Sequence, residues 1–519
     1  MRCLGAKKPD RTGLLNTTYK NILHITDAAA RKEWEDTCHD ELAKLQEHKV
    51  YELVDCPTNR KVIKNWWMFN VKPNGRKHAH LVAKGFSQVE GIDYDKLFFP
   101  VVRYETVWMM LALAALKGWH MEALDIKSAY LYGKLDEEIY MKQSKGFKVP
   151  GKEFKVLRLL CALYSLKQAG LAWWNALNES MSELSFKCLK SKPRIFFYKK
   201  RGTTMVVAII YVDDALFCGP NKVLVDEVKA LFMHKWECRD LDPATEFLHM
   251  RIKQSGSKIL IDQCAYLDKL LNWFGLLNAQ TAPTPLLEGY YPPINNEAAD
   301  PETWSLFQTL IRSLLYIALG TCPDISYAVA SLSQHSANPN RKHIKMATRV
   351  FQYPLDTHHY SLIYDGKPND GLIAFVDSDW ASDPDSHQSH TGWITKLTGG
   401  VFSWASHQQN NITYSSTKAE YVAANDYARQ AIWIRNIFGE MGYNIKPFPI
   451  CVDNQGAIFM ASNPVTEHRN KHIDIHHKGI NEFVKDKKIE LFYIEGSENP
   501  ADMFMKSLSH ILFTSLGHN

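Results

Sequence analysis

The sequence predicts a multi-domain protein of the α+β and α/β classes, and three observations lead to this prediction. The chain has 519 residues, which is enough for several domains. Its content of 45% hydrophobic and 23% charged residues is ordinary for globular proteins. Strand-like and helix-like stretches lie on both sides of a proline-rich segment, residues 282–299. We therefore expect this segment to link two folded parts.

Charge and cysteine content restrict the class of protein further. A net charge of +5 is compatible with a nucleic-acid partner but is too small to predict one. The ten cysteines contain no Cys-x-x-Cys pair, so neither a zinc finger nor a disulfide framework is indicated, and we expect an intracellular location. Since no segment approaches 18 uninterrupted apolar residues, we expect a soluble chain without a membrane partner.

The first elements are predicted to be an arm, a helix and a hairpin. Residues 1–25 are polar and without period, which predicts a poorly ordered arm. Asp27 is a suitable N-cap for a helix that runs to about His48. The apolar stripe of this helix consists of Trp34, Cys38, Leu42 and Leu45. Residues 51–82 alternate in polarity around Pro73-Asn-Gly75, which predicts a β-hairpin.

The next stretch predicts a helix followed by a strand that ends in a carboxylate. Residues 106–117 have helical spacing, with Val107, Leu111 and Ala114 expected to face the core. In the strand that follows, alternation places Met121, Ala123 and Asp125 on one face, so that Asp125 lies at the strand end.

Two adjacent carboxylates interrupt the most apolar part of the chain. The runs 206–210 and 215–218 predict a buried hairpin with Asp213 and Asp214 at its turn. Two such charges repel each other unless a cation lies between them, and a divalent metal commonly supplies that charge. An ordinary turn is an equally good explanation of the pair alone, because Asp favours turns. Asp125 on a neighbouring strand favours the metal.

Beyond the hairpin, residues 223–236 and 266–274 predict helices, and residues 304–335 and 342–353 predict connecting helices. A new strand pattern begins at residue 371 and includes a later helix that starts near Ser415. Four carboxylates lie at its element ends or on a helix that faces its sheet: Asp377, Glu420, Asp453 and Asp502. Taken singly, Glu420 could complete a capping box with Thr417, and Asp502 could cap a last helix that opens at residue 499.

Six motifs occur in the order found in the polymerase of Ty1/copia-type retrotransposons, and the chain resembles that family over residues 50–275. The motifs are Gly85-Phe-Ser-Gln-Val-Glu-Gly-Ile-Asp-Tyr94, Pro100-Val-Val-Arg103, Leu124-Asp-Ile-Lys127, Glu138-Ile-Tyr-Met141, Leu163-Tyr-Ser-Leu-Lys-Gln-Ala169 and Tyr211-Val-Asp-Asp214. Residues 371–508 resemble the ribonuclease H of the same elements, with all four acidic positions filled.

This resemblance implies a right-hand polymerase, with fingers, palm and thumb, followed by a helical connection and a ribonuclease H-like mixed-sheet domain. The implied parts are an arm (1–25), a reverse transcriptase (26–280), a linker with connection helices (281–370), the ribonuclease H-like domain (371–508) and a tail (509–519). The implied activity is RNA-directed DNA synthesis and the cleavage of RNA in RNA–DNA hybrids.

The resemblance also implies roles for particular residues. Asp125, Asp213 and Asp214 would bind two Mg²⁺ ions, as would Asp377, Glu420, Asp453 and Asp502 in the second site, and Mn²⁺ could replace Mg²⁺. Tyr130 would act as an aromatic steric gate that favours deoxynucleoside triphosphates. Residues 163–170 match a nucleotide-contacting helix. The implied substrate-binding residues are Tyr130, Lys167, Gln168, Lys84 and Arg103.

The chain departs from the family pattern at several positions, which leaves alternatives open. His78, His80, Ser165, Leu171, His249 and Arg312 replace the usual family residues. A decayed copy without polymerase activity, or a non-catalytic nucleic-acid-binding protein on the same scaffold, would fit these changes. Neutral imidazole at positions 78 and 80 cannot form the bidentate phosphate contact of a guanidinium. A competing metal pair, His472 and His476, is disfavoured because no further ligand cluster lies nearby in the sequence.

The expected partners are an RNA template, a DNA primer, their hybrid and deoxynucleoside triphosphates. No protease signature and no integrase zinc pattern occurs, so we expect a polyprotein fragment or a truncated copy, with protease and integrase on other segments. The expected location is the cytoplasm, in virus-like particles, and the nucleus.

Overall fold

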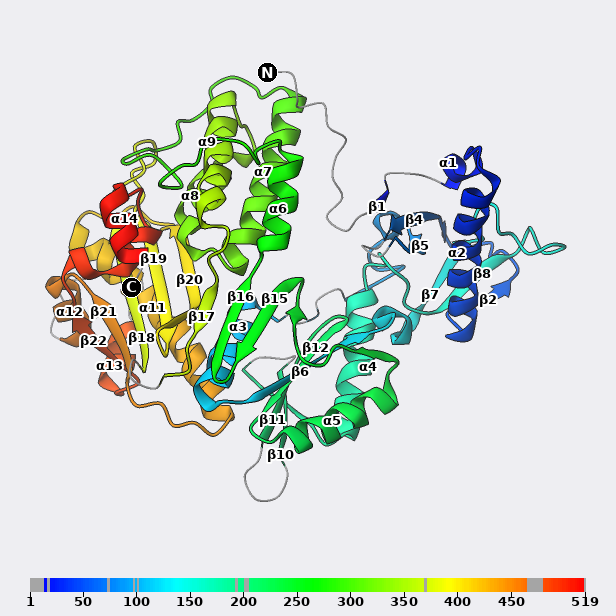
Figure 1. The fold of residues 1–519 in the computed structure, drawn as a ribbon, viewed down its shortest axis with the longest axis horizontal. Helices are drawn as coiled ribbons and strands as arrows, with labels where there is room; N and C mark the ends of the chain where they lie inside the picture. Colours follow the sequence, from blue (N-terminus) through cyan, green and yellow to red (C-terminus); the bar gives the residue numbers. More distant parts are fainter. Residues whose placement is uncertain are drawn as a thin grey trace.

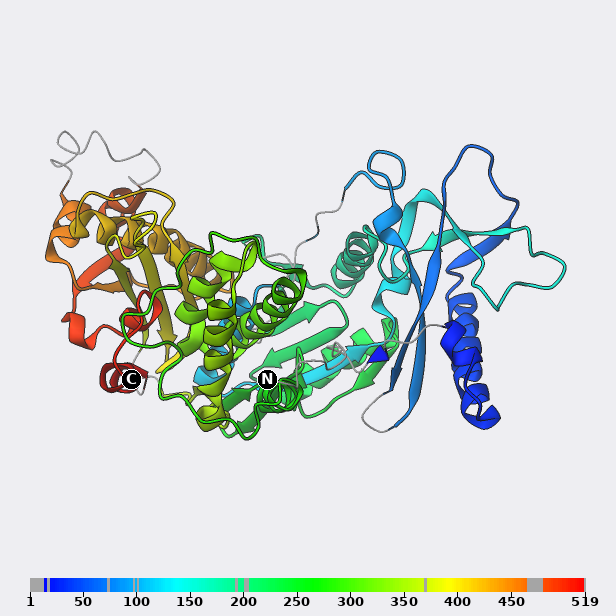
Figure 2. The same ribbon diagram turned by 90° about the horizontal axis from the view of Figure 1, so that it is seen from above.

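The computed structural model describes residues 14–15, 19–71, 75–96, 99, 102–191, 195–199, 205–367, 371–463 and 479–517. It confirms a mixed α and β protein of several parts, built on five sheets. Figures 1 and 2 agree that the N-terminal part lies at one end of the molecule and the C-terminal part at the other. Within the described residues, no helix is long and apolar enough to cross a membrane.

The fingers consist of two small sheets covered by helices. Helix α2 confirms the predicted cap, because the Asp27 carboxylate accepts hydrogen bonds from the backbone N–H groups of Ala29 and Ala30. The helices are α1 (Tyr19–Leu23) and α2 (Ala28–Glu47). One sheet has the order β1 (Leu14–Leu15), β4 (Asn65–Val71), β5 (Lys77–Ala83), and the other β2 (Tyr51–Val54), β8 (Val156–Cys161), β7 (Lys134–Lys142), β3 (Val62–Ile63).

The palm is a six-stranded sheet with helices on its faces. Its order is β13 (Cys238–Asp240), β6 (His120–Ile126), β12 (Asp214–Gly219), β11 (Met205–Tyr211), β10 (Ile195–Lys199), β9 (Lys187–Cys188). Its helices are α3 (Tyr104–Lys117), α4 (Ala169–Glu183) and α5 (Lys222–Lys235). The prediction that α3 faces the core on one side is incomplete, since every residue from Thr106 to Ala115 is buried. A second layer therefore covers its other side.

Two further predictions in this part were wrong in detail. Residues 163–168 form turns, and α4 begins only at Ala169, because Ser165 adopts a left-handed backbone with φ of +66°. The resemblance to the family also implies one strand over residues 246–252, but the structure has two short strands there, since Leu248 and His249 both have positive φ and turn the chain. The interruptions lie at Ser165 and His249, two positions at which the resemblance to the family implies glycine.

The connection is packed tightly between the palm and the C-terminal domain. Strand β17 (Leu362–Tyr364) pairs with β16 (Lys258–Asp262), which extends the sheet of β14 (Glu246–Phe247) and β15 (Met250–Ser255). The helices are α6 (Cys264–Trp273), α7 (Pro301–Gly320), α8 (Ser326–Ser333), α9 (Arg341–Gln352) and α10 (Pro354–Thr357). The proline-rich segment is held to α9, because Ala282 N–H donates to the Gln352 carbonyl and Pro293 O lies 2.8 Å from His343 Nε2.

The C-terminal domain, residues 371–517, is a five-stranded mixed sheet with helices against it (Figure 1). The order is β20 (Gly400–Gln408), β19 (His390–Leu397), β18 (Leu372–Asp379), β21 (Phe448–Val452), β22 (Ile489–Tyr493), with parallel pairing from β18 onward. The helices are α11 (Ser416–Glu440), α12 (Gln455–Ser462), α13 (Gly479–Lys485) and α14 (His510–Gly517). The helix predicted to open at residue 499 is only a short 3-10 helix, Pro500–Phe504.

Two candidate carboxylate sites

The first site is built on the β11–β12 hairpin. Tyr211 and Asp214 face each other across the turn, and Val212 has φ of +57°. The indole N–H of the buried Trp173 donates to the Val212 carbonyl at 2.9 Å, which fixes this strained turn to helix α4. The predicted hairpin is thus present, with Asp213 at its tip.

Asp125 lies beside this tip. It is the cross-strand partner of Asp214, and the N–H of Ile126 donates to the Asp213 carbonyl at 2.7 Å. Directly opposite residues in a sheet hold their side chains close together. Unlike those of three carboxylates in the second site, the oxygens of these three, all among the described residues, do not all lie within 4.8 Å of one another. Their role as ligands stays a prediction.

The electrostatics of the hairpin tip favour the arrival of positive charge. Burial and the charge of Asp213 raise the pKa of Asp214 from 3.8 to about 7, and His249 opposes this shift. Burial and the nearby Asp214 charge also raise the pKa of Tyr104, at the start of α3. A cation at this position would relieve the repulsion between the carboxylates. Neither Tyr104 nor the electrostatic effect of His249 was predicted from the sequence.

The predicted nucleotide contacts Lys167 and Gln168 already have partners within the fingers. The Lys167 ammonium donates to the Tyr94 hydroxyl at 2.8 Å and lies over its ring. Gln168 is buried, donates to the Asp93 carbonyl at 2.8 Å and accepts from Gln88. These bonds join the motif of residues 163–169 to the motif of residues 85–94. Gln168 thus has a packing role that its motif did not indicate.

The candidate steric gate Tyr130 is packed against a second tyrosine, Tyr164. Its ring meets that of Tyr164 edge-on, with 6.0 Å between centroids. Burial raises the pKa of Tyr164, and Asp213 is among the charges that contribute. Tyr130 is thus packed against a tyrosine on which the Asp213 charge acts, and its role as a steric gate stays a prediction.

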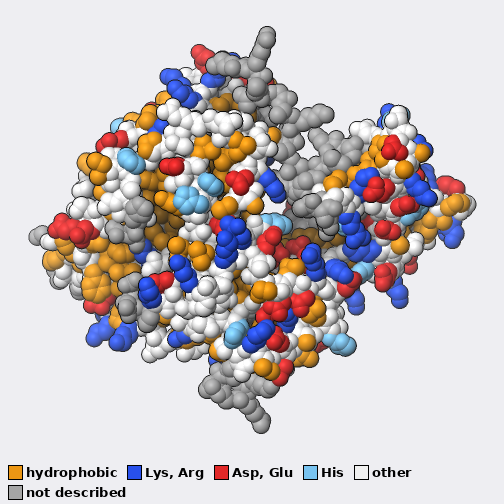
Figure 3. Space-filling view, in the orientation of Figure 1, with side chains coloured by type: hydrophobic (Ala, Val, Ile, Leu, Met, Phe, Trp, Pro, Cys, Tyr) orange, Lys and Arg blue, Asp and Glu red, His pale blue; other side chains and the backbone are white. Residues whose placement is uncertain are grey.

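The two predicted basic contacts occupy different places. Lys84 precedes the 3-10 helix Gly85–Ser87, and its N–H donates to the Lys64 carbonyl. Arg103 is exposed at the N-terminus of α3, where its guanidinium lies 5.9 Å from the ring centroid of Trp433 in the C-terminal domain. Lys and Arg side chains gather along both sides of the hollow between the fingers and the rest of the molecule (Figure 3).

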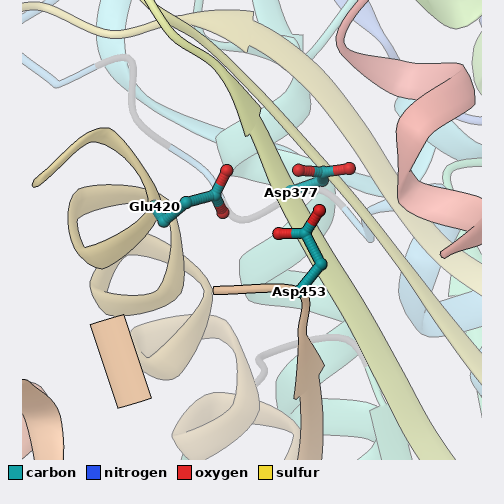
Figure 4. A group of neighbouring side chains, drawn as sticks. All are labelled: Asp377, Glu420 and Asp453. Atoms are coloured by element: carbon teal, nitrogen blue, oxygen red, sulfur yellow. The ribbon is translucent and has the colours of Figure 1, made fainter. Parts of the chain in front are cut away.

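The second site brings three predicted carboxylates together. Asp377, Glu420 and Asp453 each offer an oxygen, and these oxygens lie within 4.8 Å of one another. The side chains point toward one another from β18, from α11 and from the end of β21 (Figure 4). Parallel pairing of β18 with β21 places Asp377 and Asp453 at the same edge of the sheet, one residue beyond the paired Val376 and Val452.

Hydrogen bonding disfavours the capping explanations of these residues. Glu420 Oε1 accepts from the N–H and hydroxyl of Ser378, and Ser415 caps α11 instead. Asn499 provides the cap that was considered for Asp502. Within the described residues, Asp377 Oδ2 and Glu420 Oε2 are buried without a hydrogen-bond partner. Buried anionic oxygens without donors are costly, so the donor set fits a divalent metal.

Asp502 joins the group through a lysine that sequence reasoning missed. Lys506 Nζ lies 2.6 Å from Asp502 Oδ1, four residues earlier in the chain. The charges of Asp502 and Asp377 raise the pKa of Lys506 against the effect of its burial. Asp379 is close enough for the Lys506 charge to act on its carboxyl group. In the sequence, Asp379 lies two residues after Asp377, and Lys506 lies four residues after Asp502. These spacings were the only sequence signals for the two residues.

The carboxylates of this second site repel one another strongly. Burial and the charges of Glu420 and Asp453 raise the pKa of Asp377 well above its ordinary value. Burial, with Asp453, raises the pKa of Glu420 from 4.5 to about 8. The disfavoured metal pair His472 and His476 lies outside the described residues.

Comparison with known proteins agrees with the polymerase motifs. Residues 48–288 match the family model of reverse transcriptases (RNA-dependent DNA polymerases). A Pol polyprotein of transposon TNT 1-94 from Nicotiana tabacum is 33% identical over 90% of this chain and 36% of its own length. A Pol polyprotein of transposon RE1 from Arabidopsis thaliana is 29% identical over 93% of this chain and 33% of its own length. The chain thus spans about a third of these relatives.

Other similar proteins include a yeast transposon protein and a viral enzyme. The putative transposon Ty5-1 protein of Saccharomyces cerevisiae is 28% identical over 58% of this chain and 98% of its own length. A foamy viral protease–reverse transcriptase solved in complex with double-stranded DNA aligns with a TM-score of 0.48 and 12% identity, over 89% of this chain and 70% of that one.

Proposed function

We propose, from the premise that the chain belongs to the Pol polyproteins of Ty1/copia-type retrotransposons, that it is an RNA-directed DNA polymerase that also cleaves RNA in RNA–DNA hybrids. The observation that carries the polymerase is the pairing of Asp125 with Asp214 inside the matched segment. Residues 26–280 would form the polymerase and residues 371–508 the ribonuclease H-like domain.

In the polymerase, Asp125, Asp213 and Asp214 would hold two divalent ions, for which Mg²⁺ suits the all-oxygen ligands. Such ions activate the primer hydroxyl and stabilise the charge of the leaving pyrophosphate. The chain's own contribution is to hold these carboxylates at a fixed turn, through Trp173 and the Ile126 N–H. Tyr130 would restrict the space beside the sugar and so favour deoxynucleotides.

In the C-terminal domain, Asp377, Glu420, Asp453 and Asp502 would hold ions that activate water for attack on an RNA phosphate. The donorless oxygens of Asp377 and Glu420 support this assignment. Ser378 orients Glu420 from the adjoining strand. Recognition of the hybrid would depend on its backbone shape, and the basic side chains around the hollow supply charge for its phosphates (Figure 3).

A second candidate is a folded copy that lacks polymerase activity. One observation favours it: Ser165 and His249, which replace family glycines, both have left-handed backbones, with φ of +66° and +60°. Left-handed geometry is costly for residues other than glycine, so these substitutions strain the turn before α4 and the turn beside Asp214.

Primer extension and hybrid cleavage, each measured with Mg²⁺ and with a chelator, separate these candidates. The proposed function requires both activities and the loss of both in the chelator. The inactive copy would cleave hybrid without extending the primer. A binding protein on this scaffold would retain the hybrid in a mobility-shift assay and do neither, which would refute the proposal.

A further inference from the structure

The C-terminal half of helix α11 lies against the palm. Gln430 Nε2 donates to Glu105 Oε2 at 3.2 Å, and Ser403 of β20 donates to the other oxygen of the same carboxylate at 3.3 Å. At the end of α11, Glu440 accepts from the backbone N–H groups of Lys190 and Ser191, at 2.6 and 2.8 Å. Charged hydrogen bonds of this kind are among the stronger polar contacts in proteins.

Residues 103–105, at the start of α3, contact both the surroundings of Asp214 and the C-terminal domain. Arg103 lies over Trp433 of α11, while Tyr104 stacks on Trp108 and is near enough to Asp214 for that charge to act on its hydroxyl. Glu105, the next residue, binds the C-terminal domain. Neighbouring side chains of one helical turn thus contact the surroundings of the polymerase carboxylates and the ribonuclease H-like domain.

Helix α11 connects this contact to the second pocket. Its first turns carry Glu420, and its last turns carry the residues that touch the palm. A single helix of 25 residues is a rigid element, so the two ends move together. Apolar packing adds to the contact, since residues Thr106–Ala115 of α3 are buried and Trp108 lies in one hydrophobic cluster with Phe402 of β20.

We propose that three α11 residues form a joint with the palm that fixes the position of the ribonuclease H-like site relative to the polymerase carboxylates: Gln430 through Glu105, Trp433 through Arg103, and Glu440 through the backbone of residues 190–191. This inference rests on the proposed function for its consequence: the distance from the primer end to the RNA cut is set by the joint. The joint residues are positioning residues, because they act on the hybrid only through the two domains.

The test uses the full chain on an RNA template that carries a DNA primer. In the double variant Gln430→Ala/Trp433→Ala we expect unchanged primer extension and unchanged cleavage of a blunt hybrid, but loss of the sharp cutting position measured from the primer end. The matched control is Arg429→Ala, since exposed Arg429 pairs with Asp426 on the same helix and should leave the position sharp. An equally sharp position in the double variant would overturn the proposal.

A second measurement remains decisive if the chain is inactive or the double variant does not fold. Urea unfolding of Glu105→Ala, Gln430→Ala and their combination forms a double-mutant cycle, since each single change removes one partner of the hydrogen bond. The joint predicts that the combined change costs less than the sum of the single changes. Strict additivity would overturn the joint irrespective of activity, whereas coupling in a chain without activity would leave the joint standing and reject the proposed function.

Discussion

Single residues in this chain carry backbone strain that the sequence pattern alone only partly revealed. Ser165 and His249 stand at family glycine positions, and the structure gives both a positive φ. Ser165 also lies against Gly85, where a Cβ would approach the Ser165 carbonyl oxygen to 1.9 Å. The turn therefore cannot relax toward Gly85, and its strain persists in the folded state.

Replacing Ser165 with glycine should stabilise the protein. The left-handed conformation costs a non-glycine residue about 1 kcal/mol, and this exceeds the entropy that glycine adds to the unfolded chain. Urea unfolding should show the gain. The matched control is Ser182→Gly, in the last turn of α4, which should lose about 0.5 kcal/mol because glycine favours a helix less than serine does. Equal losses in both variants would show that position 165 is not strained.

Glu420 should make the stability of the metal-free protein dependent on pH. Since folding raises its pKa from 4.5 to about 8, the folded state favours the protonated acid. The stability that this group contributes is fully present below pH 4.5 and is lost as the pH rises through about 8. In urea unfolding with a chelator, wild type should therefore lose stability relative to Glu420→Gln across this window. A constant difference would contradict the assigned environment.

Among the elements, the palm strand β6 is held to helix α5 by two ion pairs of one buried carboxylate. The Glu122 carboxylate is buried between Lys229, at 3.0 Å, and Lys222, at 2.8 Å. Both lysines come from α5, so this network ties the helix to the strand that ends in Asp125.

Loss of Lys229 should destabilise the palm. Lys229→Met leaves a buried carboxylate with one partner fewer, which should cost about 3 kcal/mol. Lys235, also on α5, forms an exposed ion pair with Glu183 of α4. Lys235→Met should therefore cost less than about 1 kcal/mol. Chemical denaturation of both variants tests the contrast. Equal costs would mean that the buried pair adds nothing beyond a surface pair.

The predictability of these elements follows from their local signals. The α2 cap, the β11–β12 hairpin, the strand that carries Asp377 and the strand that precedes Asp453 were predicted because caps, turns and apolar periods are encoded within a few residues. The burial of α3 on all sides was missed, since the layer on its other side includes strand β20, whose Ser403 lies 298 positions after Glu105. Lys506 and the packing role of Gln168 were missed for the same reason: their partners are set by tertiary contacts.

At the scale of the whole molecule, the palm, the connection and the C-terminal domain share one hydrophobic core. The cluster that contains Trp108 of α3 also contains Phe351 of α9 and Phe402 of β20. Palm, connection and C-terminal domain therefore pack against one another, and the proline-rich segment is fixed along α9. Two chemically similar carboxylate groups are thus carried on one framework, at different sheets (Figure 1).

The most direct test of the account compares Asp213→Asn and Asp453→Asn in the full chain, with extension and cleavage followed on the same primed template. Each amide keeps the shape of its side chain but removes a charge needed by a divalent ion. Two separate sites predict that Asp213→Asn abolishes DNA synthesis and leaves hybrid cleavage, and that Asp453→Asn does the reverse. If either substitution eliminated both activities in a protein that remains folded, the two-site account would be contradicted.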